Sequence, residues 1–517
     1  MQFTATPAPT IIASPWPTPA IPEVDFAGHV LRCAERLADR PALVDAADGH
    51  TLTYAGLAVA ARRTAAGLAA RGFGPGEVLG VCSPNLPEFA VLVLGVAIAG
   101  GTTTMVNPLY TVRELAFQLR DSGARMAVTI PPLIDRAGEA ARDAGVETVL
   151  VYGELDADGE PPSVPIAPDD VVLLPYSSGT TGLPKGVEIT HRAVVANLVQ
   201  IEPLLTLTPE DVVLAVAPMF HCMGLVNVVC HALCQGAKVV TMARFDFGEF
   251  LRVMQDQRVT ASIIAPPIAL ALAAHPAVDG FDLSALRWLG CGAAPLDGRV
   301  EQRCAQRLGC GFGQGYGMTE ATAAIAIPIV DLPEQVVPGT VGQLVPGTEA
   351  RVIDPATGAD LRTDAEGELL IRGPQLMRGY RRHPGATAAT VDADGWLHTG
   401  DLAAVASDGL VRITDRLKEL IKVKGSQVAP GELEGLLRQH PSVADAAVIG
   451  VPDETAGEVP KAFIVARGEL AADELISWVA ERVAPHKRIR AVELVEEIPR
   501  LPSGKILRRV LRNCTSQ

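Results

Sequence analysis

Apolar and polar positions follow two different periods in the first part of the chain. Apolar side chains recur every three or four positions over residues 54–72 and 112–123, which predicts amphipathic helices. Short, mostly apolar runs at 78–83, 102–107 and 126–130 predict buried strands. Helices that alternate with short buried strands are typical of the α/β class.

The same alternation continues through the middle of the chain. The apolar run VVLLPY (171–176) and the segment GVEIT (186–190) predict two strands joined by a loop. A helix is predicted at about 192–205, and the apolar segments after it predict strands at 212–221, 237–245, 261–267 and 286–295. Repeated units of this kind predict largely parallel sheets that are covered on both faces.

The pattern changes twice in the last third. Beyond residue 339, short alternating strands with Gly and Asp turns predict a small β subdomain, with strands at 349–358, 367–374 and 409–416. After residue 416 the chain predicts a separate α+β unit, with helices at 430–440 and 472–483 and strands at 444–451 and 462–468.

The expected architecture is therefore α/β, with a large N-terminal domain followed by a small α+β C-terminal domain. The large domain combines two α/β subdomains with the small β subdomain. We expect a flexible Pro-rich arm over residues 1–22, the N-terminal domain over 23–416 and the C-terminal domain over 417–517.

Composition excludes several classes of protein. The chain has 517 residues and a formal net charge of −15, which argues against a general nucleic-acid or anionic-membrane surface. Nine cysteines without a C-x-x-C pair lie mostly in apolar segments, which indicates reduced core thiols and a cytoplasmic protein, with no zinc site. The N-terminus lacks the features of a signal peptide, and no apolar run is long enough to span a membrane.

The segment SSGTTGLPKG (177–186) is the strongest chemical signal. Glycines, hydroxyls and one lysine in a loop between two strands suit a phosphate cradle, formed by backbone N–H groups, the hydroxyls and the Lys185 ammonium. It is not the P-loop of nucleoside triphosphatases, because Gly186 stands where that motif requires Ser or Thr. The alternative interpretation is a flexible surface turn.

Five strings in the expected order resemble the adenylate-forming superfamily, which includes acyl-CoA synthetases, peptide-synthetase adenylation domains and luciferases. They are the phosphate loop, QGYGMTEA (314–321), GWLHTGD (395–401), DRLKELIKVKGSQVAPGELE (415–434) and LPSGKILRR (501–509). The chain is most similar to the 4-coumarate:CoA ligase branch, over about residues 52–509.

This resemblance implies a ligase that uses ATP, Mg²⁺ and CoA to form an acyl adenylate and then an acyl-CoA thioester. Because both reactants of the first step are anions, cations and oriented dipoles must surround the phosphates. The resemblance gives Glu320 as the Mg²⁺ ligand. It gives as ATP and AMP contacts Ser177, Ser178, Gly179, Thr180, Thr181, Gly182, Lys185, Gly292, Ala293, Gln314, Gly315, Tyr316, Gly317, Thr319, Asp401 and Arg416.

The resemblance also implies a mobile C-terminal domain that carries the catalytic lysine, Lys505. Lys418 matches the hinge, and Lys422 and Gln427 match residues that support catalysis. Arg244, Lys424 and Gly425 align with contacts to CoA. His221, which by itself would suggest a buried core histidine, matches a catalytic position between the acyl pocket and the adenylate.

The expected acyl pocket departs from the plant coumarate ligases. Its walls would be Cys222, Met223, Val226, Gly290, Thr322, Ala323, Ala324 and Ile325. Met223 and Val226 stand where the plant enzymes typically carry Tyr and Asn, and alanines stand at 323 and 324 where Pro and Val are usual. The comparison predicts an apolar, roomier pocket for a hydrophobic aryl acid such as a cinnamate or coumarate analogue.

Other functions remain open on the sequence. The acceptor could be a carrier protein or an amine, and the acid a medium-chain fatty acid or nitrite for diazotisation. A luciferase-type oxygenase and a non-catalytic nucleotide-binding protein are further alternatives, the latter disfavoured by Lys185, Glu320 and Lys505 together. The partners expected are a small carboxylic acid, ATP and CoA, without nucleic acid or a membrane span, in a monomer or homodimer.

Overall fold

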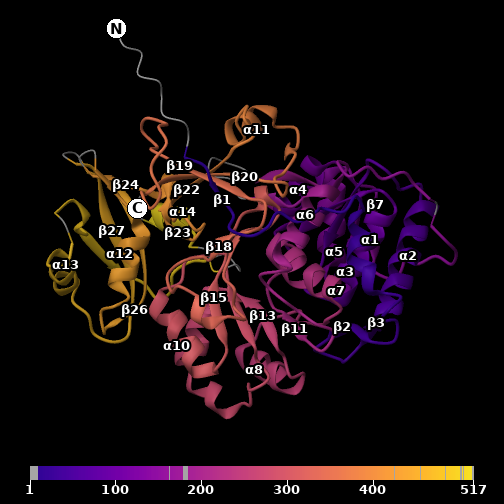
Figure 1. Ribbon diagram of the computed structural model, residues 1–517, viewed down its shortest axis with the longest axis horizontal. Coiled ribbons are helices and arrows are strands. Elements are labelled where there is room, and N and C mark those ends of the chain that lie inside the picture. Colours follow the sequence, from indigo (N-terminus) through magenta and orange to yellow (C-terminus); the bar gives the residue numbers. More distant parts are fainter. Residues whose placement is uncertain are drawn as a thin grey trace, which may run out of the picture.

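Two largely parallel sheets form the larger part of the protein, and a smaller unit lies at one side of them (Figure 1). The structure is a computed structural model, which describes residues 10–161, 163–177, 184–423, 426–453, 456–483, 485–500, 504 and 506–514. In the described part of the chain, no helix is long and apolar enough to cross a membrane.

The first sheet is built from the strands of the N-terminal third. Five parallel strands, in the order β8-β5-β4-β6-β7, continue into antiparallel strands at one edge. The parallel strands are β4 (Val78–Cys82), β5 (Thr102–Val106), β6 (Ala124–Thr129), β7 (Thr148–Val151) and β8 (Val171–Leu173); the others are β9 (Tyr176–Ser177), β10 (Lys185–Thr190) and β21 (Gly379–Tyr380).

Helices cover both faces of this sheet because successive strand residues face opposite sides. Val78 and Cys82 pack against α4 (Val112–Ser122) and α5 (Ile134–Ala144), whereas Leu79 and Val81 pack on the side of α2 (Tyr54–Ala70) and α3 (Pro87–Ile98). A capping box between Thr111 and Glu114 begins α4, and Gly123 ends it in the left-handed conformation, with φ at 68°.

The second sheet runs in the order β15-β14-β13-β11-β12-β2-β3 and is parallel except for its last pair. Its strands are β2 (Pro41–Asp45), β3 (Thr51–Thr53), β11 (Val212–Ala215), β12 (Lys238–Thr241), β13 (Ala261–Ile264), β14 (Trp288–Cys291) and β15 (Gly311–Gln314). One face packs against α8 (Phe247–Asp256), α9 (Pro266–Ala274) and α10 (Gly298–Leu308).

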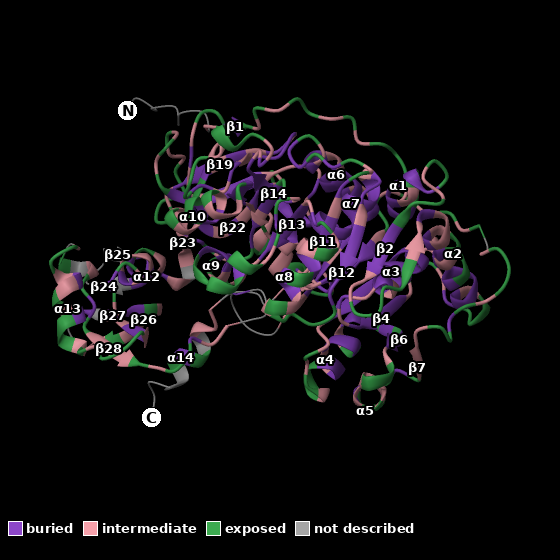
Figure 2. Ribbon diagram, turned by 90° about the horizontal axis from the view of Figure 1, so that it is seen from below, coloured by how far each residue is buried: buried purple, intermediate pink, exposed green. Residues whose placement is uncertain are grey.

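The other face of the second sheet shares one hydrophobic core with the first sheet. Helix α3 lies between them, and its side chains are buried on nearly every face, which explains its apolar sequence from Phe89 onward. Figure 2 shows this buried centre as purple strands beneath a partly exposed shell.

Antiparallel strands close the large domain, as the alternating sequence predicts. The order β1-β19-β20-β22-β23 joins β1 (Ile12–Ala13), β19 (Glu349–Ile353), β20 (Gly367–Arg372), β22 (Leu397–Val405) and β23 (Val411–Arg416). A smaller sheet pairs β16 (Tyr316–Gly317), β17 (Ala324–Ile327) and β18 (Gln343–Leu344).

The N-terminal arm differs from the loose segment predicted. Ile12 pairs with Ala350 as strand β1, Ile12 is buried in the core of the antiparallel sheet, and the Ser14 hydroxyl donates to the Leu344 carbonyl at 2.8 Å. The edge strand β19 offers backbone N–H and C=O groups that pair with this segment. The prolines of the arm suggested a loose segment and gave no sign of this pairing.

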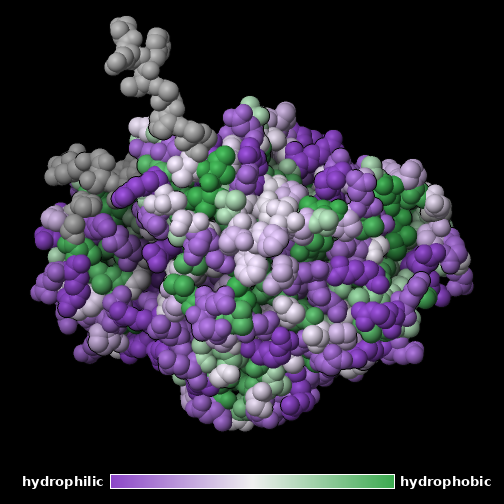
Figure 3. Space-filling model, viewed as in Figure 1, coloured by the Kyte–Doolittle hydropathy of each residue, from purple (hydrophilic) through white to green (hydrophobic). Residues whose placement is uncertain are grey.

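The C-terminal unit has its own core. Strands run in the order β25-β24-β27-β26, with β28 parallel to β27; they are β24 (Ile421–Val423), β25 (Ser426–Val428), β26 (Val443–Asp453), β27 (Gly457–Ala466) and β28 (Ala491–Leu494). Helices α12 (Pro430–Leu437) and α13 (Ala472–Ala480) cover one face, and α14 (Arg508–Cys514) packs on the other. The face of the molecule seen in Figure 3 is mainly hydrophilic, with hydrophobic residues in small groups.

Candidate active site

A pocket of about 490 Å³ opens where the parallel strands of the second sheet end and the antiparallel strands begin. The carboxyl ends of parallel strands are where α/β sheets bind ligands. Expected nucleotide contacts on its wall are Ser177, Gly292, Ala293, Gly315, Tyr316, Gly317, Thr319, Asp401 and Arg416, and the expected metal ligand Glu320 lies there too. Expected acyl-side residues on the same wall are His221, Cys222, Met223, Gly290, Ala323 and Ala324.

Asp401 lies on one side of the pocket between two donors. Strands β22 and β23 pair Asp401 directly with Arg416, whose Nε lies 3.3 Å from Asp401 Oδ1. The Tyr316 hydroxyl donates to Asp401 Oδ2 at 2.5 Å, and burial together with this carboxylate raises the pKa of Tyr316 well above its ordinary value. Tyr316 therefore remains a donor at neutral pH, and the sheet register fixes the carboxylate in place.

Glu320, the expected metal ligand, is only 6% exposed and shares the pocket wall with Ser177 and Pro184. Its Oε1 accepts a hydrogen bond from the Tyr380 hydroxyl at 2.8 Å, and Lys185 Nζ lies 5.3 Å from the centre of the Tyr380 ring. Sequence reasoning missed Tyr380, which comes to the site because β21 pairs with β10 and sets Tyr380 opposite Val187.

The chemistry around Glu320 suits magnesium. Among the described residues, no group of three or more His, Cys, Asp and Glu side chains could hold a metal ion by itself. Mg²⁺ commonly takes one or two carboxylates and completes its shell with water and phosphate oxygens. A single buried carboxylate at the phosphate end of the pocket therefore fits this ion.

Close backbone packing shapes the wall next to Glu320. A Cβ on Gly317 would lie 1.6 Å from the Ala323 carbonyl oxygen, so this glycine serves the chain's own packing of β16 on β17. The resemblance gave Gly317 as a nucleotide contact, and it also lies on the pocket wall. Thr322 adopts a φ of 63° and is fully buried, and its hydroxyl donates to the Gln375 carbonyl at 2.7 Å. The strained turn holds the segment that carries Glu320.

His221 and Cys222 line the pocket as uncharged groups. Burial lowers the pKa of His221 to about 4, so its imidazole is neutral near pH 7. Burial raises the pKa of the Cys222 thiol to about 12, which keeps it protonated. Neither residue therefore adds a charge to this end of the pocket, which suits an apolar acyl group.

Three expected pocket residues do not line it. Val226 and Ile325 are fully buried in hydrophobic cores, and Thr322 bonds to the backbone as described above. Asn227, which the sequence did not single out, is on the wall instead. Met223 to Cys230 form a π-helix, labelled η3, and its wide turn changes which side chains share a face. A lone amide within the apolar run LVNVVC was the signal available in the sequence.

Gln314, an expected nucleotide contact, faces the protein interior. Its side chain accepts from the Leu296 N–H at 2.8 Å and donates to Glu301 Oε2 at 3.0 Å, and burial raises the pKa of Glu301. Gln314 thus braces the strand that leads to Gly315. Lys185 lies beside the pocket rather than on its wall, and Arg244 is exposed between β12 and α8.

Several predicted residues lie outside the part of the chain that the structure describes. They are Ser178, Gly179, Thr180, Thr181, Gly182, Lys424, Gly425 and Lys505. The side chains of Lys418, Lys422 and Gln427 also fall outside it. The neighbour of Lys505 is described: a Cβ on Gly504 would lie 3.0 Å from Pro267 Cδ. Gly504 therefore lies close to the large domain just after β13 ends.

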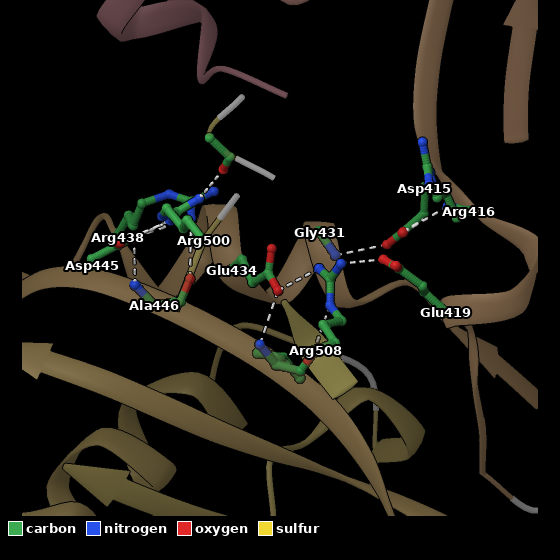
Figure 4. A network of polar contacts seen from close by, with 12 residues as sticks. Asp415, Arg416, Glu419, Gly431, Glu434, Arg438, Asp445, Ala446, Arg500 and Arg508 are labelled. Atoms are coloured by element: carbon green, nitrogen blue, oxygen red, sulfur yellow. Dashed lines mark hydrogen bonds and ion pairs between the residues drawn. The ribbon is translucent and has the colours of Figure 1, made fainter. Parts of the chain in front are cut away.

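Ionic contacts join the expected hinge to the end of the chain (Figure 4). Arg508 binds Glu419 and donates to Glu434 Oε1 at 2.6 Å. Asp415 accepts from the Gly431 N–H at 2.7 Å, and burial raises the pKa of its carboxyl to about 6. The last strand of the large domain is thus hydrogen-bonded to the first helix of the small one.

Comparisons with known proteins agree with this geometry. The family model described as AMP-binding enzyme matches residues 30–381, and the AMP-binding enzyme C-terminal domain matches residues 432–505. The chain is 40% identical to a 4-coumarate--CoA ligase of Pinus taeda, over 95% of this chain and 96% of the relative. It is 41% identical to 4-coumarate--CoA ligase 3 of Oryza sativa subsp. japonica, over 93% and 91%.

Solved structures give the same result for the fold. ATP-bound MatB from Rhodopseudomonas palustris superimposes with a TM-score of 0.87 at 28% identity, over 96% of this chain and 99% of that one. The o-succinylbenzoate CoA synthetase MenE from Bacillus subtilis, with ATP and magnesium ion, gives 0.84 at 27% identity, over 95% and 100%. Both the large and the small domain are therefore shared with these enzymes.

Proposed function

The chain belongs to the AMP-binding enzyme family as an AMP-forming acid–CoA ligase, and from this premise we propose that its acid is a hydrophobic aryl acid, such as a cinnamate or coumarate analogue. The observation that carries the proposal is one continuous pocket of about 490 Å³ that joins nucleotide-side residues to an apolar wall. This volume falls within the usual range for small-molecule sites, roughly 300–1,000 Å³.

The first step joins the acid carboxylate to the α-phosphate of ATP as pyrophosphate leaves. Lys185 supplies positive charge to the leaving pyrophosphate, and Thr319 offers a hydroxyl to the α-phosphate. Glu320 would hold the magnesium ion, which would neutralise negative charge on the phosphates when bound. Asp401, fixed by Tyr316 and Arg416, accepts the ribose hydroxyls.

The acyl end of the pocket excludes water and charge. Neutral His221 and protonated Cys222 border it, and the small side chains of Ala323 and Ala324 leave room for a ring. Desolvation at this end favours an apolar group, while the carboxylate of the acid remains near the cationic phosphate end.

The second step transfers the acyl group to the CoA thiol. We assign to Lys505 the role of the catalytic lysine of adenylation, and to Lys422 and Gln427 a supporting role in catalysis. Lys418 is assigned as the hinge. We assign CoA contacts to Arg244, Lys424 and Gly425. The contact of Gly504 with Pro267 supports approach of the lysine segment to the large domain. Rotation of the small domain about the hinge would then move the Lys505 segment away from the pocket and bring the face with the CoA contacts to it.

One variant separates the two steps. Lys505→Ala should lose adenylate formation by orders of magnitude, yet still convert a supplied acyl adenylate into its thioester. Pyrophosphate release and thioester formation are measured separately, with wild type as the reference. Equal loss in both steps would show that the lysine does not act specifically in adenylation.

The substrate class is tested by pyrophosphate release with ATP, Mg²⁺ and a panel of cinnamic, benzoic and medium-chain fatty acids and nitrite, with and without CoA, and products identified by mass. Aryl-dependent release with a CoA thioester as product supports the proposal. Release without a thioester indicates a carrier protein or amine as acceptor. Release that depends on fatty acids or nitrite instead would overturn the aryl assignment.

A further inference from the structure

Glu301 is a buried carboxylate near the start of α10, a helix that packs against the second sheet. The buried residues of this helix are Glu301 and Cys304, and Glu301 is 2% exposed. Positions that pack on a sheet are ordinarily apolar, because a carboxylate loses its hydration there. The contacts that Glu301 makes must therefore offset this cost.

One oxygen of this carboxylate, Oε2, accepts two hydrogen bonds. Gln314 Nε2 donates to it at 3.0 Å, and the Gly339 N–H donates to it at 3.2 Å. The other end of the Gln314 amide, Oε1, accepts from the Leu296 N–H at 2.8 Å. Gln314 is 5% exposed, so both ends of its amide are held inside the protein. Because Oε2 of Glu301 is an acceptor, it fixes which end of the Gln314 amide points toward Leu296.

The Gln314 amide joins two backbone segments of the nucleotide wall. They are residues 292–293, which follow β14, and residues 315–317, which follow β15. The first segment leaves the sheet through a left-handed turn at Ala293, with φ at 73°. Such a turn is strained for a residue that has a Cβ, and it persists where surrounding contacts hold it. The bond from Leu296 to Gln314 is a contact of this kind, and Glu301 orients it.

We propose that Glu301 is a positioning residue for the base of ATP, because it holds the two wall segments, through Gln314, at the spacing that a purine ring needs; this rests on the proposed function. Gly292 and Gly315 leave the backbone of both segments open to a flat ring. Without the carboxylate, Gln314 Nε2 would lose its acceptor, and the amide would be free to turn away from Leu296. The two segments would then separate, and the base would lose contacts that the ribose and the phosphates keep.

The test compares substitutions at Glu301 with a control on the same helix. Glu301→Gln keeps an acceptor oxygen for Gln314, whereas Glu301→Leu is of similar size and removes it. AMP binding is measured by calorimetry, and pyrophosphate release gives kcat and the KM values for ATP and for the acid. Cys304→Ala is the control, because Cys304 is also buried and its thiol donates to the Ala269 carbonyl, away from Gln314.

Glu301→Leu should weaken AMP binding and raise the KM for ATP by about 10-fold to 100-fold, as expected when a buried hydrogen-bond partner is removed. The KM for the acid and kcat at saturating ATP should stay within about threefold of wild type, as should AMP binding by Glu301→Gln and Cys304→Ala. A loss of AMP affinity below about threefold in Glu301→Leu overturns the inference, since Glu301 then serves only stability. An equal loss in Glu301→Gln and Glu301→Leu overturns it as well, because the acceptor for Gln314 would then not matter.

The outcomes also distinguish this inference from the proposed function. Calorimetry with AMP needs no acid, so if no aryl acid supports release, the proposed function fails and the AMP affinities still decide the role of Glu301. Should Glu301→Leu fail to fold, Glu301→Asp decides, because it keeps the charge but withdraws the oxygens from Gln314 by one methylene. A loss of AMP affinity of about fivefold or more in Glu301→Asp supports the inference, and a smaller loss overturns it.

Discussion

Arg508 makes a prediction that can be worked out from its surroundings. Its side chain is 11% exposed and binds three acceptors, which are the carboxylates of Glu419 and Glu434 and the Val448 carbonyl at 3.2 Å (Figure 4). Glu434 is buried as well, with a side chain that is 6% exposed. Arg508→Met keeps much of the length of the side chain and removes the charge, so two carboxylates lose their cation.

The magnitude follows from the burial of these groups. Removal of one partner from a buried ion pair costs about 3–5 kcal/mol, because the remaining charge stays desolvated. We take the lower end, about 3 kcal/mol, because Glu419 is less buried than Glu434. At about 1.4 kcal/mol for each tenfold change, local opening of the C-terminal domain should become about 100-fold more frequent.

Hydrogen exchange measured by mass spectrometry reads this opening directly. Amides of β26 and β27 should exchange about 100-fold faster in Arg508→Met, while amides of β4 and β5 in the large domain should keep their rates. Arg482→Met is the matched control, since Arg482 pairs with Glu481 at the surface of the same domain and should change exchange only slightly. The double variant Arg508→Met/Glu434→Gln should recover part of the loss by removing one unpaired charge.

Exchange in β26 and β27 that stays within about threefold of wild type would refute this reasoning. It would mean that the attraction of Arg508 to the two carboxylates only equals the cost of desolvating the Arg508 guanidinium. A loss of protection that the double variant does not reduce would refute it differently, by showing that packing of the Arg508 stem matters more than its charge.

Three further predictions concern the pocket and the hinge. Gly224→Ala should displace η3, because its Cβ would meet the Pro218 carbonyl at 2.2 Å; we expect a stability loss of about 1–3 kcal/mol and lower kcat/KM for aryl acids, and unchanged melting and kinetics would contradict this. Tyr380→Phe removes the hydrogen bond to Glu320 and should raise the Mg²⁺ concentration for half-maximal pyrophosphate release by about 10-fold or more; an unchanged value would reject this positioning role. Asp415 has a pKa raised from 3.8 to about 6 in the folded protein, so its contribution to stability is present below pH 4 and is lost as pH rises through 6. The free energy of unfolding of Asp415→Asn, relative to that of wild type, should therefore rise by about 3 kcal/mol from pH 4 to pH 8 in denaturation experiments. A difference between the two proteins that does not vary with pH would contradict this pKa.

Much of the fold follows from local pattern. Amphipathic periods predicted α2 and α4 within two residues, and apolar runs predicted β4, β5 and β6. These patterns succeed because backbone period and one-sided burial are properties of a single segment. The strand predicted over residues 212–221 ends at Ala215 instead, where the chain turns toward η3. The anchoring of Ile12 depends on a partner, Ala350, that no local pattern reveals.

For the candidate site, too, the sequence predicts some features and packing decides others. The sequence by itself placed Lys185, Glu320 and Asp401 in short motifs, and from the local chemistry of those motifs we propose contacts to phosphate, metal and ribose. Only the tertiary structure decided what holds them. Tyr380 reaches Glu320 through strand pairing, and Asn227 replaces Val226 on the wall through a π-turn pressed against Pro218. Strand register and the width of a helical turn are set by packing between segments far apart in the chain, and a linear pattern does not encode them.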